Sequence, residues 1–214
     1  MPKKPLILIG GGGHCKSCID VIESATGWEI IGILDGNIKP GDNVLNYSVI
    51  GDDNDIDKLI KNNYFFFITV GQIKSATIRE NLFNNLKLKS ARIATIISAN
   101  AVVSKYANIG EGTMIHHACV VNAGAHIGKN NIINTGAIIE HDARIGNNNH
   151  ISTNSTVNGD VKIGNCCFIG SGAVISNKIS ITNNVILGAG SLVLKDIVRA
   201  GIYAGCPAKI LGGK

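Results

Sequence analysis

The C-terminal half of the chain carries an aliphatic residue at every sixth position without interruption. A period of six matches neither the 3.6-residue turn of a helix nor the alternation of a single strand, so it indicates an internal repeat. Glycine follows the aliphatic residue at intervals of eighteen residues, or three hexads, at Gly110, Gly128, Gly146 and Gly164. The repeat therefore predicts a β-solenoid with three-sided coils. Its aliphatic positions are Ile97, Val103, Ile109, Ile115, Val121, Ile127, Ile133, Ile139, Ile145, Ile151, Val157, Ile163, Ile169, Ile175, Ile181, Leu187 and Val193.

Stacking of the coils converts this period into a rough geometry. Neighbouring strands lie about 4.8 Å apart, so residues eighteen apart are expected one above another. This rule places Gly159 one coil from His141, beside the acidic residues Glu140 and Asp142. A carboxylate that binds one imidazole nitrogen fixes the tautomer and raises the basicity of the other nitrogen, as a general base requires. Asp142, next to the corner residue Ala143, is the preferred partner of His141, and Glu140 is the alternative.

The N-terminal third has a different organisation. An apolar run at 6–9 predicts a buried strand, glycines at 10–13 form a turn into a helix, and 30–34 predicts a second strand that ends at Asp35. Strand, turn, helix and strand form a βαβ unit with a parallel sheet. Backbone N–H groups at such a helix start can bind phosphate. The glycine pattern matches neither the complete dinucleotide fingerprint nor a Walker A loop, so neither NAD chemistry nor ATP hydrolysis follows.

Later segments complete a small α/β domain. We expect a short helix starting near Asp55, a strand at 64–70, and a helix through Ile78, Arg79, Leu82 and Leu86. The stretch 93–97 leads into the first coil. The predicted domains are therefore a Rossmann-like domain at 1–92 and a β-helix at 93–214.

Composition excludes several classes of function. The net charge of +5 is spread along the 214 residues without a basic stripe, so no nucleic acid partner is expected. The apolar run near the start is too short for a secretory signal or a membrane span, which predicts a cytoplasmic protein without a membrane partner. The six cysteines are expected as reduced thiols. Cys15 and Cys18 form a CxxC pair that we interpret as helix packing rather than a redox motif.

Four segments carry a resemblance to a known family. They are 134–142 (NTGAIIEHD), 145–150 (IGNNNH), 158–164 (NGDVKIG) and 201–209 (GIYAGCPAK). Together with the glycine-rich start, they resemble the bacterial hexapeptide-repeat sugar acyltransferases, which include nucleotide-sugar N-acetyltransferases and sialic acid O-acetyltransferases. The resemblance covers nearly the whole chain. It implies a Rossmann-like nucleotide-sugar domain followed by a left-handed parallel β-helix.

The resemblance also implies roles for individual residues. His141 is expected as the catalytic base, with Asp142 or Glu140 as its orienting acid, and the Gly159 amide as a donor to the oxyanion. Asn134 is expected to line the acceptor sugar. The other residues expected to bind the nucleotide sugar are Gly11, Gly12, Gly13, His14, Asp35 and Gly71. Those expected to bind acetyl-CoA are His150, Ser152, Gly159, Ser171, Ala189 and Lys209.

The leading hypothesis is acetyl transfer from acetyl-CoA to the amino group of a nucleotide-linked 4-amino-4,6-dideoxy sugar, for lipopolysaccharide or another surface polysaccharide. O-acetylation of sialic acid or a related nonulosonate is the nearest alternative, and a non-catalytic solenoid scaffold is the third. The resemblance further implies a homotrimer with acetyl-CoA between subunits. No metal is expected, because a zinc site of the hexapeptide carbonic anhydrase type needs two histidines five residues apart, a spacing this sequence lacks.

Overall fold

The computed structural model describes residues 2–211. It divides into two compact units. One comprises the chain up to Gly71 together with Thr77–Ala99, and the other comprises Gln72–Ala76 together with the chain from Asn100 onward. The expected domain limit at residues 92 and 93 falls within the first unit, because β6 (Arg92–Ile93) pairs with β5 (Phe65–Ile68) of its sheet.

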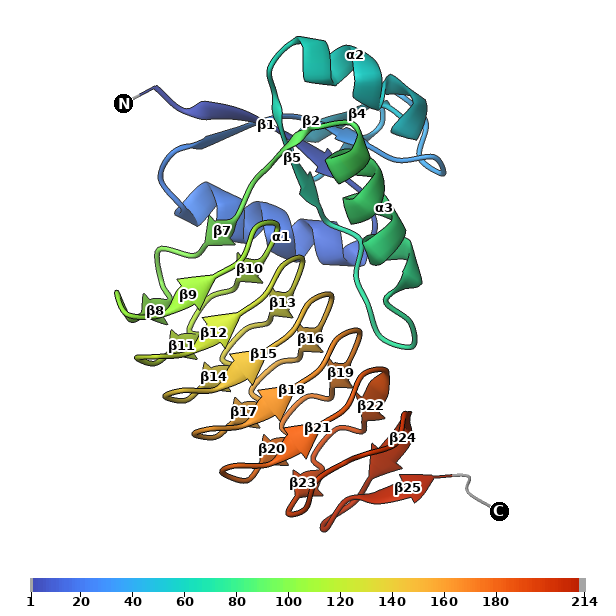
Figure 1. Ribbon diagram of the computed structural model, residues 1–214. Coiled ribbons are helices and arrows are strands. Elements are labelled where there is room, and N and C mark those ends of the chain that lie inside the picture. Colours follow the sequence, from blue (N-terminus) through green and yellow to red (C-terminus); the bar gives the residue numbers. More distant parts are fainter. Residues whose placement is uncertain (1, 212–214) are drawn as a thin grey trace. The chain divides into compact units, whose positions relative to one another are not determined.

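The N-terminal unit is built on a six-stranded sheet with the order β3-β4-β2-β1-β5-β6 (Figure 1). Its first strand is parallel to both neighbours, β2 and β5, and the aliphatic side chains at 6–9 are buried, as is typical of a central parallel strand. The predicted βαβ unit is confirmed. Besides β5 and β6, the elements of this unit have the following bounds: β1 (Lys4–Ile9), α1 (Gly13–Ser24), β2 (Trp28–Leu34), β3 (Asn43–Val44), β4 (Tyr47–Gly51), η1 (Asp53–Asp55), α2 (Ile56–Lys61), α3 (Thr77–Leu88) and β7 (Ile96–Ile97).

Two features of this unit differ from the sequence-based expectation. The hairpin of β3 and β4 was not anticipated. In α3, Ile78 is 65% exposed, whereas Arg79 is buried. The buried guanidinium is accommodated because Nη1 donates to the carbonyl oxygens of Ile68 and Val70, at 2.9 and 2.7 Å. Its burial lowers the pKa of Arg79 to about 10.

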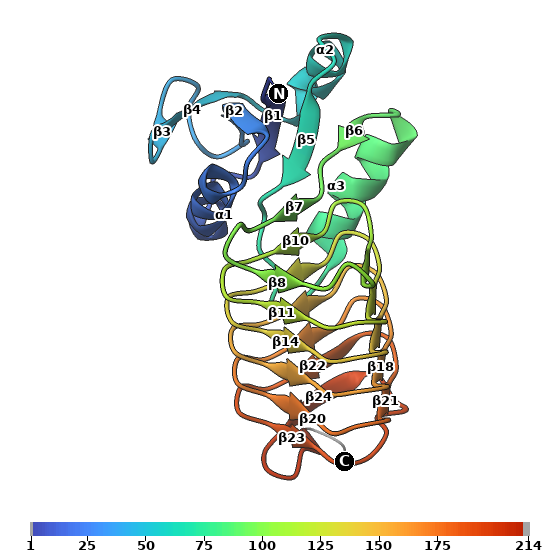
Figure 2. The same ribbon diagram turned by 90° about the vertical axis from the view of Figure 1, so that its left-hand side faces the viewer.

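The C-terminal unit is a parallel β-helix with three faces (Figure 2). The first face contains β10 (Met114–Ile115), β13 (Ile132–Ile133), β16 (His150–Ile151), β19 (Phe168–Ile169), β22 (Val185–Leu187), β24 (Gly201–Ala204) and β25 (Lys209–Leu211). The second face contains β8 (Val102–Val103), β11 (Val120–Val121), β14 (Ile138–Ile139), β17 (Thr156–Val157), β20 (Val174–Ile175) and β23 (Leu192–Val193). The third face contains β9 (Asn108–Ile109), β12 (His126–Ile127), β15 (Arg144–Ile145), β18 (Lys162–Ile163) and β21 (Ser180–Ile181).

From β8 to β23, strand pairing follows the predicted period of eighteen, whereas β24 pairs with β22 at an offset of sixteen and β25 is antiparallel to β24. On the second face, for example, Val121, Ile139 and Val157 lie one above another in register. The aliphatic ladder fills the interior from Ile115 onward, and hydrophobic burial along this continuous column stabilises the coils. Ile97, which the period assigns to the same ladder, is instead 38% exposed. It lies in the N-terminal unit.

Candidate active site

The first candidate group is His141, which lies in the turn between the second and third faces. Its Nδ1 is 2.9 Å from Asp142 Oδ2, and the His141 and Asp142 side chains are 58% and 61% exposed. Asp142 has φ of 60°, a left-handed conformation that aspartate tolerates. This turn brings together two side chains that an extended chain would direct to opposite sides. Since a carboxylate only accepts, Nδ1 carries the proton and Nε2 presents its lone pair.

The surroundings of His141 increase its basicity. Its pKa is raised above the ordinary value of 6.5, chiefly by the hydrogen bond that Nδ1 donates to Asp142. Desolvation opposes the shift, and the charges of Asp142, Asp160 and Glu140 add to it. Glu140 is not hydrogen-bonded to His141. Its Oε2 accepts from Asn122 Nδ2 at 2.9 Å, one coil away. Asp142 is therefore the carboxylate that holds the His141 ring.

Gly159 lies directly against the free side of that ring. A Cβ atom built on Gly159 would be 2.7 Å from His141 Nε2 and 3.2 Å from Asn177 Nδ2, so no side chain fits while the imidazole keeps its position. Among the described residues, the Gly159 N–H donates no backbone hydrogen bond outside the regular strands. The pair thus combines a nitrogen lone pair with an available backbone donor, the two groups that acyl transfer requires.

A second candidate group lies between the first and second faces. His150 is 7% exposed, and its Nε2 is 3.1 Å from Asn134 Nδ2. Ser152 Oγ is 2.9 Å from Ser171 Oγ, on the next coil. Ser171 and Ala189 are both exposed, and their spacing of eighteen places them on successive coils. These residues, polar except for Ala189, form one edge that runs along the solenoid.

The structure does not bring His141 and His150 together within one chain. His141 follows β14, whereas Asn134 precedes it, so the two groups occupy opposite edges of the second face (Figure 2). Gln72 joins the second group, although the sequence did not single it out. Its backbone oxygen is 2.6 Å from His150 Nδ1, and no local periodicity links residues 78 positions apart.

The N-terminal unit presents a candidate anion site at the start of α1. Gly12 is the N-cap, and a Cβ atom at Gly12 or Gly13 would meet nothing within 4 Å. Exposed N–H groups at a helix start favour phosphate. Asp35 shapes this loop, because its Oδ2 accepts from the Gly11 N–H at 2.6 Å and its Oδ1 accepts from the Asn37 N–H at 2.7 Å. The Gly11 amide is thus already occupied by a carboxylate.

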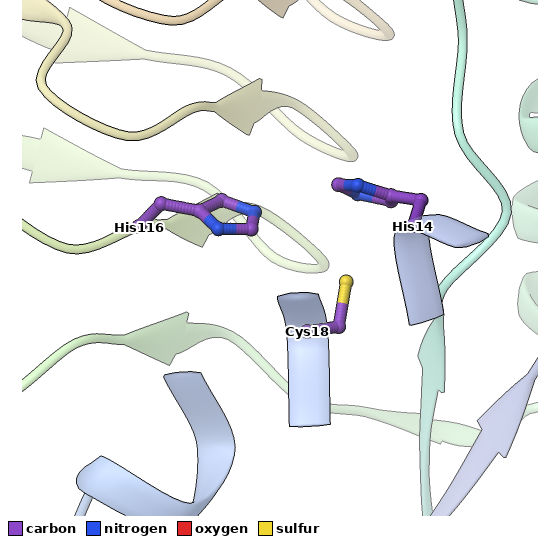
Figure 3. Close-up of side chains that lie close together, drawn as sticks. All are labelled: His14, Cys18 and His116. Atoms are coloured by element: carbon purple, nitrogen blue, oxygen red, sulfur yellow. The ribbon is translucent and has the colours of Figure 1, made fainter. Parts of the chain in front are cut away.

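His14 and Cys18 lie one turn apart on α1, with their side chains near each other (Figure 3). A Cβ atom on Gly71 would be 3.3 Å from the His14 Cβ, so the absence of a side chain at Gly71 leaves room for His14. Burial raises the pKa of the Cys15 thiol to about 11, and burial also raises that of Cys18. Both thiols are buried and protonated, which supports a packing role rather than thiolate chemistry.

A hollow lies at the C-terminal end of the solenoid. It is lined by Leu194, Lys195, Tyr203, Pro207, Ala208 and Lys209, among others. Apolar walls suit a flat ring, and the charged lining consists of two lysines, which suit phosphate groups, and Asp196. Across the described residues, no helix has the length and apolar character needed to cross a bilayer.

Comparisons with known proteins identify related sequences and structures. The chain matches the family model of the PglD N-terminal domain at residues 5–86 and that of the bacterial transferase hexapeptide at 124–159 and 142–177. It is similar to perosamine N-acetyltransferase from Caulobacter crescentus, solved as a histidine-to-asparagine variant in complex with CoA and GDP-perosamine. Identity is 31% over 98% of this chain and 97% of that chain, with a TM-score of 0.91.

A second solved structure is the acetyltransferase domain of PglB from Neisseria gonorrhoeae FA1090 in complex with acetyl coenzyme A. It is 28% identical over 98% of this chain and 100% of that chain, with a TM-score of 0.91. WeeI from Acinetobacter baumannii AYE, at 22% identity and a TM-score of 0.86, shares the fold. No curated protein sequence matches the chain.

Proposed function

This chain belongs to the bacterial hexapeptide-repeat sugar acyltransferases, and from that premise we propose that it acetylates the amino group of a nucleotide-linked 4-amino-4,6-dideoxy sugar. Its solenoid is accordingly a left-handed parallel β-helix, and acetyl-CoA is the co-substrate. The observation that carries the proposal is the pairing of His141 Nε2 with the backbone of Gly159. GDP-perosamine, the ligand of the Caulobacter enzyme, is the first acceptor to test.

The proposed chemistry is direct transfer. His141 Nε2 removes a proton from the acceptor amine as its nitrogen attacks the thioester carbonyl carbon. Asp142 stabilises the imidazolium that results, and the Gly159 N–H donates to the oxyanion of the tetrahedral intermediate. Collapse of this intermediate breaks the carbon–sulfur bond, and the imidazolium returns a proton to the departing CoA thiolate. The products are an amide and free CoA.

A homotrimer would complete the site. The second face presents an outward column of five aliphatic residues and one threonine, Val102, Val120, Ile138, Thr156, Val174 and Leu192, whose first member is 67% exposed and whose others are partly exposed. An exposed apolar column of this kind is suited to self-association. The His141 edge and the His150 edge flank this column, so a neighbouring copy packed on it could bring one edge to the other. A closed ring of three copies would form three such sites.

The sugar nucleotide and the nucleotide end of acetyl-CoA would bind at separate places. We propose that the amides of Gly12 and Gly13, with His14 and Gly71 beside them, contact the diphosphate of the sugar nucleotide, and that Asp35 maintains the loop. Lys209 and the hollow around it would take the nucleotide end of acetyl-CoA, while Ser152, Ser171 and Ala189 line its path. All six cysteines are free, as is typical of a protein in a reducing compartment, and we propose a cytoplasmic location. We further propose that the acetyl transfer serves surface-glycan synthesis.

Steady-state kinetics with acetyl-CoA and a panel of nucleotide amino sugars tests the proposal. Thiol release should depend on the sugar, and mass spectrometry should show a product that keeps its acetyl group after mild base, because an amide survives this treatment. An acetyl group lost in mild base would instead identify an ester and favour O-acetylation of sialic acid or a related nonulosonate. Absence of thiol release with every sugar would favour the scaffold hypothesis.

A further inference from the structure

Both ring nitrogens of His150 are engaged by neighbours, and these contacts determine its tautomer. Nδ1 lies 2.6 Å from the backbone oxygen of Gln72. A carbonyl oxygen only accepts, so Nδ1 must carry the proton. Nε2 of the neutral ring is then an acceptor, and it receives the Asn134 amide N–H at 3.1 Å. The edge of Phe168 packs against the ring with 5.2 Å between centroids, which limits its rotation.

The Gln72 carbonyl is itself held by the Gln72 side chain. Its Nε2 donates to the backbone oxygens of Asn148 at 2.9 Å and Cys167 at 3.3 Å. The same Cys167 oxygen accepts from the His150 N–H at 2.9 Å, so Gln72 and the His150 backbone share one anchor. Gln72 is 3% exposed, and a buried amide that lost these partners would carry a desolvation cost. This arrangement holds the 72–76 segment in the solenoid unit.

The orientation of Asn134 follows from these contacts. Asn134 Oδ1 accepts from the Thr135 N–H at 2.8 Å, and one hydrogen of Nδ2 points to His150. With the amide plane fixed at both ends, its remaining N–H has one defined direction. We propose that Gln72 is a positioning residue, which fixes the Nδ1–H tautomer of His150 and thereby orients Asn134 toward the acceptor sugar. The catalytic part of this inference rests on the proposed function.

The tautomer is measured directly by NMR of protein labelled with ¹⁵N-histidine. At neutral pH, the His150 ring, assigned by its loss in His150→Asn, should show a protonated Nδ1 and an unprotonated Nε2. Gln72→Met keeps the side-chain volume and removes both donated hydrogen bonds, so it should shift the ring toward a mixture of tautomers. A wild-type ring protonated at Nε2 would overturn the proposal, whether or not the enzyme is active on any sugar.

A matched control separates positioning from stability. Thr113 is a buried solenoid residue away from His150, with Oγ1 donating to the Gly128 oxygen at 2.8 Å and accepting from the Asn131 N–H at 3.1 Å. Thr113→Val therefore also loses two hydrogen bonds at nearly constant volume. Both variants should lower Tm, but only Gln72→Met should change the His150 tautomer. An unchanged tautomer in Gln72→Met would show that Gln72 is merely structural and would overturn the proposal.

A double-mutant cycle tests whether Gln72 acts through His150. Gln72→Met should lower kcat/KM for the acceptor roughly tenfold, about the value of one hydrogen bond. His150→Asn removes the acceptor for Asn134, so adding Gln72→Met to it should cause little further loss of kcat/KM, although Tm should fall further. Independent, multiplicative losses of kcat/KM would contradict positioning through His150. If no acetyl transfer is found at all, the proposed function fails, and the NMR result still decides the tautomer.

Discussion

The two histidine edges of the second face differ in how their imidazoles are held. His141 has a side chain that is 58% exposed and is bound by one neighbouring carboxylate, whereas His150 is 7% exposed and bound at both ring nitrogens. An exposed ring with a free Nε2 can take up a proton from a substrate. A buried ring that uses one nitrogen as donor and the other as acceptor is suited to fixing geometry instead. One residue type thus serves two tasks because the number of ring contacts differs.

The strongest test of this comparison removes the imidazole from the exposed edge. His141→Ala should lower kcat by about 10²- to 10⁴-fold, the usual contribution of a general base. His126, which is exposed on β12 of the third face, provides the matched control, and His126→Ala should keep nearly full activity. Steady-state thiol release with acetyl-CoA measures both variants. Wild-type turnover by His141→Ala would remove His141 as the base.

Complementation tests whether the two edges act together across subunits. His141→Ala and His150→Ala should each be nearly inactive as pure proteins. After the two variants are unfolded and refolded together, about a quarter of sites in a random trimer should combine an intact His141 with an intact His150 from its neighbour. Activity should therefore recover to roughly that fraction of wild type. Failure of the correctly assembled mixture to regain activity would argue that each chain contains its own complete site.

The pH profile tests how the Asp142 carboxylate affects the protonation of His141. Because its pKa is raised above 6.5, His141 stays protonated to higher pH than an ordinary imidazole, so kcat/KM should rise with pH through that raised value. Asp142→Asn removes the main cause of the shift and should move this rise to lower pH. The plateau should fall about ten- to hundredfold, the value of a hydrogen bond to a charged group. An identical profile in Asp142→Asn would contradict the assigned orientation of His141.

The smallest expected effect comes from adding one methyl group beside the base. In Gly159→Ala, the new Cβ would be 2.7 Å from His141 Nε2, so the exposed ring must move away. We expect kcat to fall about tenfold, with little change in Tm because the ring is not part of the core. Parallel thermal unfolding and steady-state assays measure both quantities. Full activity in this variant would show that the reaction does not need the ring beside Gly159.

Much of this site could be predicted because the solenoid is periodic. Parallel pairing sets residue i above residue i+18, so the sequence places Gly159 beside His141. The register also accounts for the buried column from Ile115 onward. The period did not predict that Ile97, the first member of the aliphatic ladder, is 38% exposed, and it could not predict the hairpin of β3 and β4, because no repeat extends to that segment.

The sequence by itself determined the three-sided coil, its register and the position of His141 near Gly159, since these depend on contacts that recur at a fixed spacing. Only the tertiary structure decided that Asp142 rather than Glu140 binds His141, because this choice depends on a left-handed turn at one residue. It also decided that Gln72 holds His150, which lies 78 residues away. Such a contact depends on where a non-repeating segment packs, and no local pattern encodes that position.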